Sequence, residues 1–267
     1  MFDLIRTRLA QGIPTSSFPE GDPGFPARFR GRPVLLTEEA ERPEPAADLP
    51  TGMLRQDAKG LPVLDLGACL FSPEEAAPLP LCPPAALPHC RTVFSRDHRM
   101  ASRTREGLVT ATGEFELAGA LDARMRRLLG RSLRLRSVSA GSCNGCEAEL
   151  VALSNVVFDM ARFGVQFVAS PRHADGIVIT GAVSLNMREA LERTYAAVPD
   201  PRLVIAVGAC ACSGGPFAES PEVLHGVPQE IPVDLWIPGC PPHPLTVLDG
   251  LLRLLGRLED RAESSSS

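Results

Sequence analysis

Strand-like and helix-like segments alternate from about residue 112 to residue 258. The expected strands are short and apolar: residues 133–138, 165–169, 176–180, 203–207 and 233–237. The expected helices repeat apolar residues with helical spacing: residues 117–129, 146–163, 187–197 and a segment that begins at Pro244. Because parallel strands need crossover connections, this alternation predicts a parallel sheet with helices on both faces. The expected fold class is therefore α/β, with a doubly wound sheet.

Proline sets the first third of the chain apart. Fifteen of the 26 prolines lie between Pro14 and Pro88. Proline lacks a backbone donor and clashes with the preceding helical turn, so this stretch cannot hold long helices. We expect loops with short apolar pieces such as residues 62–66. The predicted organisation is a first domain at residues 1–110, a second at 111–258, and a disordered polar tail at 259–267.

Composition narrows the function classes. The net charge of −5 gives no electrostatic basis for binding nucleic acid. No apolar run approaches the ~20 residues that a membrane-spanning helix needs. The first residues also lack the pattern of a secretory leader, which is a charged stretch followed by an apolar one. We therefore expect a cytoplasmic protein whose attachment to a membrane, if it has one, comes through partner subunits.

Four of the eight cysteines follow expected strands directly. These strand-end cysteines are Cys143, Cys146, Cys210 and Cys240. In an open parallel sheet the carboxyl ends of the strands share one edge, where ligands bind. Residues far apart in sequence can therefore meet there. Thiolates are soft ligands, and four of them suit an iron–sulfur cluster or zinc.

Less specific interpretations apply to the same residues. A C-x-x-C pair alone could be part of a zinc site or a redox dithiol, although structural zinc commonly uses two close pairs. A dithiol would leave Cys210 and Cys240 unexplained. Cys212 is most simply a small buried residue. His173 and His243 could face a cofactor or partner, but such histidines are more often surface or capping groups.

Residues 132–255 resemble the small subunit of membrane-bound nickel–iron hydrogenases of the formate-hydrogenlyase type. The same family includes the B-type subunit of respiratory complex I. The resemblance rests on four segments: Ala140–Glu147, Ala169–Asp175, Val207–Cys210 with Ser213-Gly214-Gly215 after it, and Pro238–Pro242. All four ligand positions are filled in order, which makes the match specific.

The resemblance implies a flavodoxin-like fold and one proximal four-iron four-sulfur cluster held by the strand-end cysteines. It also implies electron transfer beside a hydrogenase-type large subunit, with membrane-arm subunits and a separate ferredoxin-like subunit as further partners. Complex I subunits have adjacent cysteines at the first site, so Cys143-Asn144-Gly145-Cys146 favours the hydrogenase branch. A complex I-like quinone-reducing subunit and a non-catalytic scaffold are the alternatives. Glu149 matches an acidic position of the complex I branch, although a glutamate near a helix start is commonly only a dipole partner.

Residues 1–110 resemble the ferredoxin-like electron-transfer subunit of the same complexes, at Thr7–Gly12 and Arg28–Pro33. That family binds its two clusters through two runs of closely spaced cysteines. Most of these ligands are absent here: Leu49 stands where a cysteine belongs in the first run. In the second run Cys69 is present, Ser72 and Glu75 replace cysteines, and Cys82 comes three residues late. We predict a degenerate ferredoxin-like α+β domain that has lost both clusters. Whether Cys69, Cys82 and Cys90 bind anything is left open.

Overall fold

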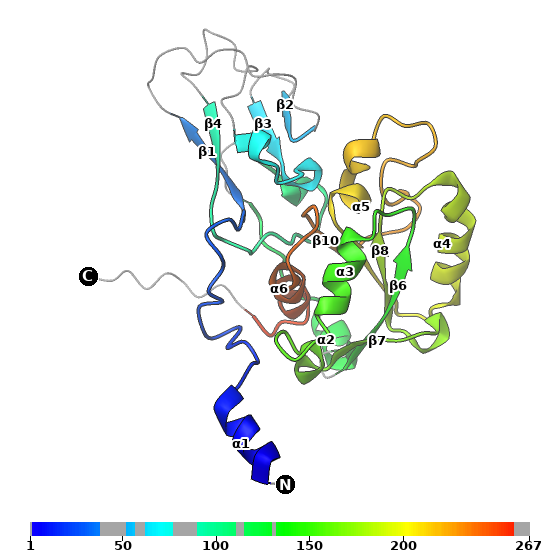
Figure 1. Cartoon of the computed structure of the whole chain (residues 1–267). Coiled ribbons are helices and arrows are strands. Elements are labelled where there is room, and N and C mark those ends of the chain that lie inside the picture. Colours follow the sequence, from blue (N-terminus) through cyan, green and yellow to red (C-terminus); the bar gives the residue numbers. More distant parts are fainter. Residues whose placement is uncertain are drawn as a thin grey trace.

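A central parallel sheet flanked by helices occupies most of the molecule, and smaller antiparallel sheets lie beside it (Figure 1). The structure is a computed structural model. It describes residues 2–37, 52–56, 62–76, 90–110, 115–129 and 132–258. The predicted tail, the position of Leu49 and the side chains of Cys82 and Cys90 lie outside this description.

The main sheet confirms the predicted fold class. Its strands are β6 (Leu133–Ser139), β7 (Val165–Phe167), β8 (Gly176–Thr180), β9 (Leu203–Val207) and β10 (Leu235–Ile237). They are all parallel and lie in the order β10-β9-β8-β6-β7. Counted within this sheet alone, the order is 2-1-3-4-5, which is the flavodoxin-like arrangement. Every residue of β8 and β9 is buried, as expected for strands covered on both faces.

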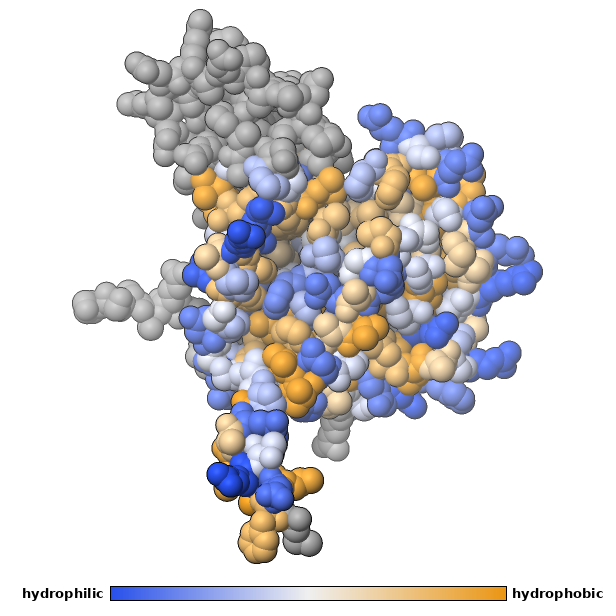
Figure 2. Space-filling view, viewed as in Figure 1, coloured by the Kyte–Doolittle hydropathy of each residue, from blue (hydrophilic) through white to orange (hydrophobic). Residues whose placement is uncertain are grey.

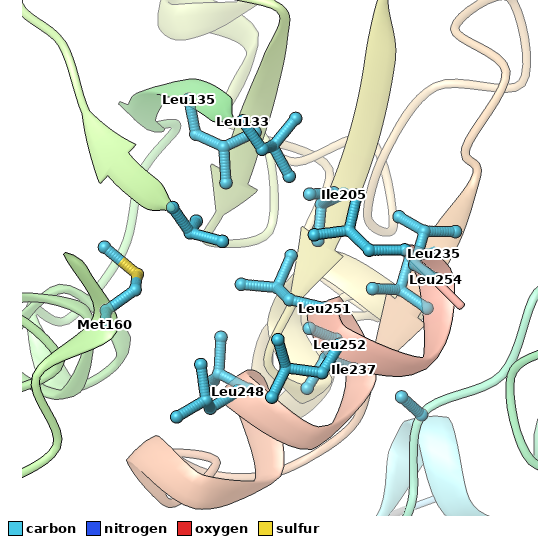
Figure 3. Packing of buried hydrophobic residues seen from close by; sticks show 14 of the residues in the cluster. Leu133, Leu135, Met160, Ile205, Leu235, Ile237, Leu248, Leu251, Leu252 and Leu254 are labelled. Carbon is cyan, nitrogen blue, oxygen red and sulfur yellow. The ribbon is translucent and has the colours of Figure 1, made fainter. Parts of the chain in front are cut away.

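Helices cover the two faces of the sheet. On one face, α3 (Gly145–Ala152) and α6 (Pro244–Leu254) pack over Val178, Ile205 and Ile237, and Figure 3 shows the leucines of α6 pointing into this core. On the other face, α4 (Leu185–Ala197) packs against Ile177, Ile179 and Val204. Neighbouring residues of one strand therefore enter opposite cores.

Two expected helices are shorter than predicted. The segment at residues 146–163 was expected to be one helix, but α3 ends at Ala152 and only a 3₁₀ turn, η4 (Met160–Phe163), follows. The side chain of Asn155 accepts hydrogen bonds from the amides of Val157 and Phe158, which replaces helical pairing by a local turn. The segment at 117–129 forms α2 (Ala123–Leu129) only. Here Asp122 accepts from the amides of Arg124 and Met125 and so starts the helix late.

The described N-terminal residues form two small antiparallel sheets and one helix. β1 (Pro33–Thr37) pairs with β4 (Cys90–Phe94). β3 (Pro62–Asp65) lies between β2 (Leu54–Gln56) and β5 (Val109–Thr110). The helix α1 (Phe2–Gln11) projects from the body and buries none of its residues (Figures 1 and 2). The ferredoxin-like origin of this part and the domain boundaries remain predictions.

The N-terminal part contacts the main sheet directly. Ser102 exchanges two backbone hydrogen bonds with Trp236 of β10, at 3.0 and 2.8 Å, and so covers that edge of the sheet. Two further 3₁₀ turns, η1 (Leu66–Ala68) and η2 (Pro73–Ala76), follow β3, and η1 packs against α5 (Ala209–Ser213). In the part of the chain that is described, no helix is both long and apolar enough to cross a membrane.

Candidate metal centre

The strand-end cysteines all lie beyond the carboxyl ends of strands of the main sheet. Cys143 is in the loop after β6, and Cys146 is in the first turn of α3. Cys210 is in the short helix α5 that follows β9, and Cys240 lies between β10 and α6. The structure therefore brings three separate chain segments to one edge of the sheet, as the sequence predicts.

The backbone around Cys210 is shaped to leave room for sulfur atoms. Gly208 has a φ of +93°, and a methyl group at this residue would lie 2.5 Å from Cys146 Sγ. Gly215 has a φ of +55°, and a methyl group there would lie 2.9 Å from Cys210 Sγ. Only glycine fits both the positive φ and the space. These glycines keep the space beside the sulfurs of Cys146 and Cys210 free.

Backbone hydrogen bonds hold the loops of Cys210 and Cys240 together. The amide of Gly208 donates to the carbonyl of Ile237, and the amide of Ala209 donates to that of Gly239, both at 2.8 Å. These carbonyls come just before Cys240, and the amides come just before Cys210. The positions of Cys210 and Cys240 are therefore fixed relative to each other by the main chain.

The thiols influence one another electrostatically. Burial, followed by the neighbouring Cys210, raises the pKa of Cys146 strongly. Burial and Cys240 raise the pKa of Cys210 to about 11. Burial and then Cys143 raise the pKa of Cys240. Thiolates gathered at one sheet edge repel one another and are stabilised by a cationic metal centre.

The donor set fits an iron–sulfur cluster. All four thiols are free; Cys143 and Cys240 are exposed, and Cys146 and Cys210 are half-buried. Among the described residues, no three His, Cys, Asp or Glu side chains converge closely enough to hold a single metal ion. A four-iron cluster is larger, and its four thiolates bind different corners, so they need not converge on one point. Four soft thiolates are donors that suit such a cluster.

Glu147 is a polar residue of the site that the sequence did not single out. Its Oε1 accepts hydrogen bonds from the hydroxyls of Ser142 and Thr180, and its Oε2 is buried with no partner among the described residues. Burial alone would raise the pKa of Glu147, but hydrogen bonds to its carboxylate, first from Ser142 and then from Thr180, contribute to lowering the pKa overall. The only signal in the sequence is an acidic residue in the first turn of a helix, which is common without a cofactor.

A cavity of about 250 Å³ lies against the Cys240 loop. Glu149 and His243 are among its lining residues, with Phe71 and Met100 from the N-terminal part. Burial raises the pKa of Glu149. His243 is a capping group, as expected: its Nδ1 accepts from the amide of Leu245 at 3.1 Å, and burial lowers its pKa to about 4.

The other described cysteine side chains are not part of this edge. Cys212 is buried, as predicted, and burial raises its pKa to about 12. Cys69 is buried in the N-terminal part, in the same hydrophobic cluster as Cys212. His173, also considered from the sequence, is exposed in the 3₁₀ turn η5 (Pro171–His173).

The sequence profile of the family described as "NADH ubiquinone oxidoreductase, 20 Kd subunit" matches residues 143–254, a stretch that contains all the strand-end cysteines. The "Probable membrane-bound hydrogenase subunit mbhJ" of Pyrococcus furiosus is 43% identical over 136 residues, which are 51% of this chain and 81% of the relative. The chain belongs to this 20 kDa subunit family. The resemblance stated for residues 132–255 is thereby confirmed.

Further members of the 20 kDa subunit family come from both of its branches. The B-type subunit of the NADH-quinone oxidoreductase of Heliobacterium modesticaldum is 47% identical over 119 residues, covering 44% of this chain and 68% of the relative. "Formate hydrogenlyase subunit 7" of Escherichia coli is 39% identical over 162 residues, covering 61% and 64%. Among solved structures, a chain of the membrane-bound sulfane sulfur reductase, an archaeal respiratory membrane complex, matches 51% of this chain and 75% of its own length, with a TM-score of 0.45 and 31% identity.

Proposed function

We propose that this chain is the electron-transfer subunit of a membrane-associated, nickel–iron hydrogenase-type complex and carries one four-iron four-sulfur cluster. The observation that supports this most directly is the gathering of the strand-end cysteines at one sheet edge in a member of the 20 kDa subunit family. A bound cluster would supply one-electron transfer.

The residues of this chain would hold and shield the cofactor. Cys143, Cys146, Cys210 and Cys240 would bind the irons as thiolates. Because Cys143 and Cys240 are exposed, a partner surface must cover them to keep water away from the cluster. The proposed partner is a hydrogenase-type large subunit that holds the catalytic metal, so that this chain contains no complete active site.

Partners also account for the proposed location, which is the inner face of the cell membrane. Relatives are named as membrane-bound hydrogenase and formate hydrogenlyase subunits. We propose that membrane-arm subunits hold this chain at the membrane peripherally. The N-terminal part, as a ferredoxin-like domain without clusters, would pass no electrons itself, so a separate carrier would have to deliver or remove them.

A complex I-like quinone-reducing subunit is the second candidate. The 47% identity to the relative from an NADH-quinone oxidoreductase favours it. The separation of Cys143 from Cys146 favours the hydrogenase branch instead. Nickel analysis and hydrogen uptake by the purified assembly distinguish the two: nickel with hydrogen uptake supports the first candidate, and quinone reduction without nickel supports the second. An assembly in which this chain contains no iron would indicate a scaffold.

Iron and sulfide analysis tests the cluster and its ligands. The full chain, reconstituted anaerobically, is expected to hold four irons and four sulfides. Cys240→Ser is expected to lose most of this iron, because it removes a thiolate ligand. Cys212→Ser is the matched control: it changes a cysteine two residues from Cys210 and is expected to keep four irons. Retention of the cluster in Cys240→Ser would contradict the assignment.

A further inference from the structure

The loop at residues 69–75 encloses a buried carboxylate. Glu75 has no exposed surface. Its Oε1 accepts a hydrogen bond from the amide of Leu70 at 2.9 Å, and its Oε2 accepts one from the amide of Ser72 at 2.8 Å. The thiol of Cys69 lies 3.6 Å from the same Oε2. Glu75 stands at one of the positions where the resemblance to ferredoxin-like subunits expects a cysteine.

This loop packs against the ligand loops of the candidate metal centre. The 3₁₀ turn η1, which leads into the loop, contacts α5, the helix of Cys210. Cys69 shares a cluster of buried residues with Cys212, and Phe71 lines the same cavity as Cys240. The loop therefore adjoins two of the three chain segments that carry the strand-end cysteines.

Glu75 is linked to this centre through Cys69. Its Oε2 lies 3.6 Å from the thiol of Cys69, and Cys69 packs in the same buried cluster as Cys212, which is two residues from Cys210. Arg28 and Arg30 line the cavity beside Cys240, but both are exposed, so solvent screens their charge more than that of buried Glu75.

The amides of Leu70 and Ser72 fix this carboxylate in place. A fixed negative charge beside a redox centre opposes the addition of an electron, and net charge is one of the factors that set cluster potentials. We propose that the carboxylate of Glu75 lowers the reduction potential of the cluster held by the strand-end cysteines. This inference rests on the proposed function, because it needs the cluster.

The test is a redox titration of the reconstituted full chain, in which one electron enters per cluster and is followed by electron paramagnetic resonance. Glu75→Gln removes the charge and is expected to favour the reduced cluster by about tenfold, which for a one-electron couple is about 59 mV upward. Glu75→Asp keeps the charge and is expected to stay nearer the parent. Glu189→Gln is the control, since it removes a charge exposed on α4 and is expected to change nothing.

A second pair of variants leaves Glu75 in place, in case Glu75→Gln does not fold. Ser72→Lys puts a cation beside the carboxylate and is expected to raise the potential above that of Ser72→Gln. The inference is overturned if Glu75→Gln shifts the potential no more than Glu189→Gln, if Glu75→Asp shifts it as much as Glu75→Gln, or if the Ser72 pair does not differ. A parent chain that binds no iron overturns the proposed function itself and this inference with it.

Discussion

Cys210 and Cys212 are separated by one residue but belong to different environments. The thiol of Cys210 lies close to Gly215 at the sheet edge, among the strand-end cysteines. Cys212 is buried in the hydrophobic cluster that joins the N-terminal part to α5. The sequence could separate the two because Cys210 follows the strand directly. The sequence could not identify Glu147. Its carboxylate accepts a hydrogen bond from Thr180 only because β6, which precedes Glu147, lies beside β8, which ends at Thr180, in the fold.

The buried thiol of Cys212 predicts a loss of stability at alkaline pH. Its pKa is about 12 in the folded chain, because burial disfavours the thiolate, and about 8.5 in an unfolded chain. Its contribution to stability is therefore complete below about pH 8.5 and is lost as the pH rises toward 12. The loss approaches about 1.4 kcal/mol per pH unit. In urea titrations of the metal-free chain at pH 8 to 10.5, Cys212→Ser is expected to lose stability less steeply than the parent. Equal slopes would contradict this.

At the scale of elements, the positions of the strand-end cysteines depend on where the strands and helices beside them begin and end. The strands β8 and β9 have the bounds that their apolar runs predict. The ends of α2 and α3 could not be predicted in the same way. Asp122 and Asn155 decide them through side-chain hydrogen bonds to the backbone, which compete with helix formation whatever the apolar periodicity. The shortened α3 leaves Cys146 in place, because the change is at the far end of the helix.

Two glycines beside the strand-end cysteines give a matched test of the loop geometry. Gly208→Ala would place a methyl group 2.5 Å from Cys146 Sγ at a φ of +93°, so we expect iron binding to be largely lost. Gly145→Ala would place its methyl group 3.5 Å from Cys143 Sγ, an ordinary contact, and is expected to keep four irons. Iron content and thermal unfolding of both variants check this. Full iron binding by Gly208→Ala would show that the loop can shift.

At the scale of the whole molecule, the N-terminal part encloses the last helix of the α/β unit. Every residue of α6 is buried, including the ion pair between Asp249 and Arg253, whose atoms lie 2.9 Å apart. Apolar periodicity predicts one buried face for this helix, but its other face is covered as well: a methyl group at Gly250 would lie 2.7 Å from Ala101 Cβ. The periodicity of α6 could not predict that its other face is covered, because the covering residue, Ala101, comes from the N-terminal part of the chain.

Arg105 connects the N-terminal part to α5, the helix that contains Cys210. Its Nη2 lies 2.7 Å from Oδ2 of Asp65, a fully buried carboxylate, and its Nε donates to the carbonyl of Cys212 at 2.9 Å. Arg105→Met removes a guanidinium that lies against this buried carboxylate, so we expect a loss of about 3 kcal/mol in the free energy of unfolding. The matched control is Arg193→Met, which breaks an exposed pair with Glu189 and is expected to cost less than about 0.5 kcal/mol.

Urea unfolding of the full chain measures both changes, and iron content shows how far the effect reaches. If Arg105 holds the N-terminal part against α5, its loss should also weaken iron binding, because η1 then no longer supports the helix that carries Cys210. Arg105→Lys keeps a charge but cannot reach both partners in the same planar geometry, so it should restore stability only in part. Equal stability of Arg105→Met and the parent would mean that packing alone joins the two parts of the chain.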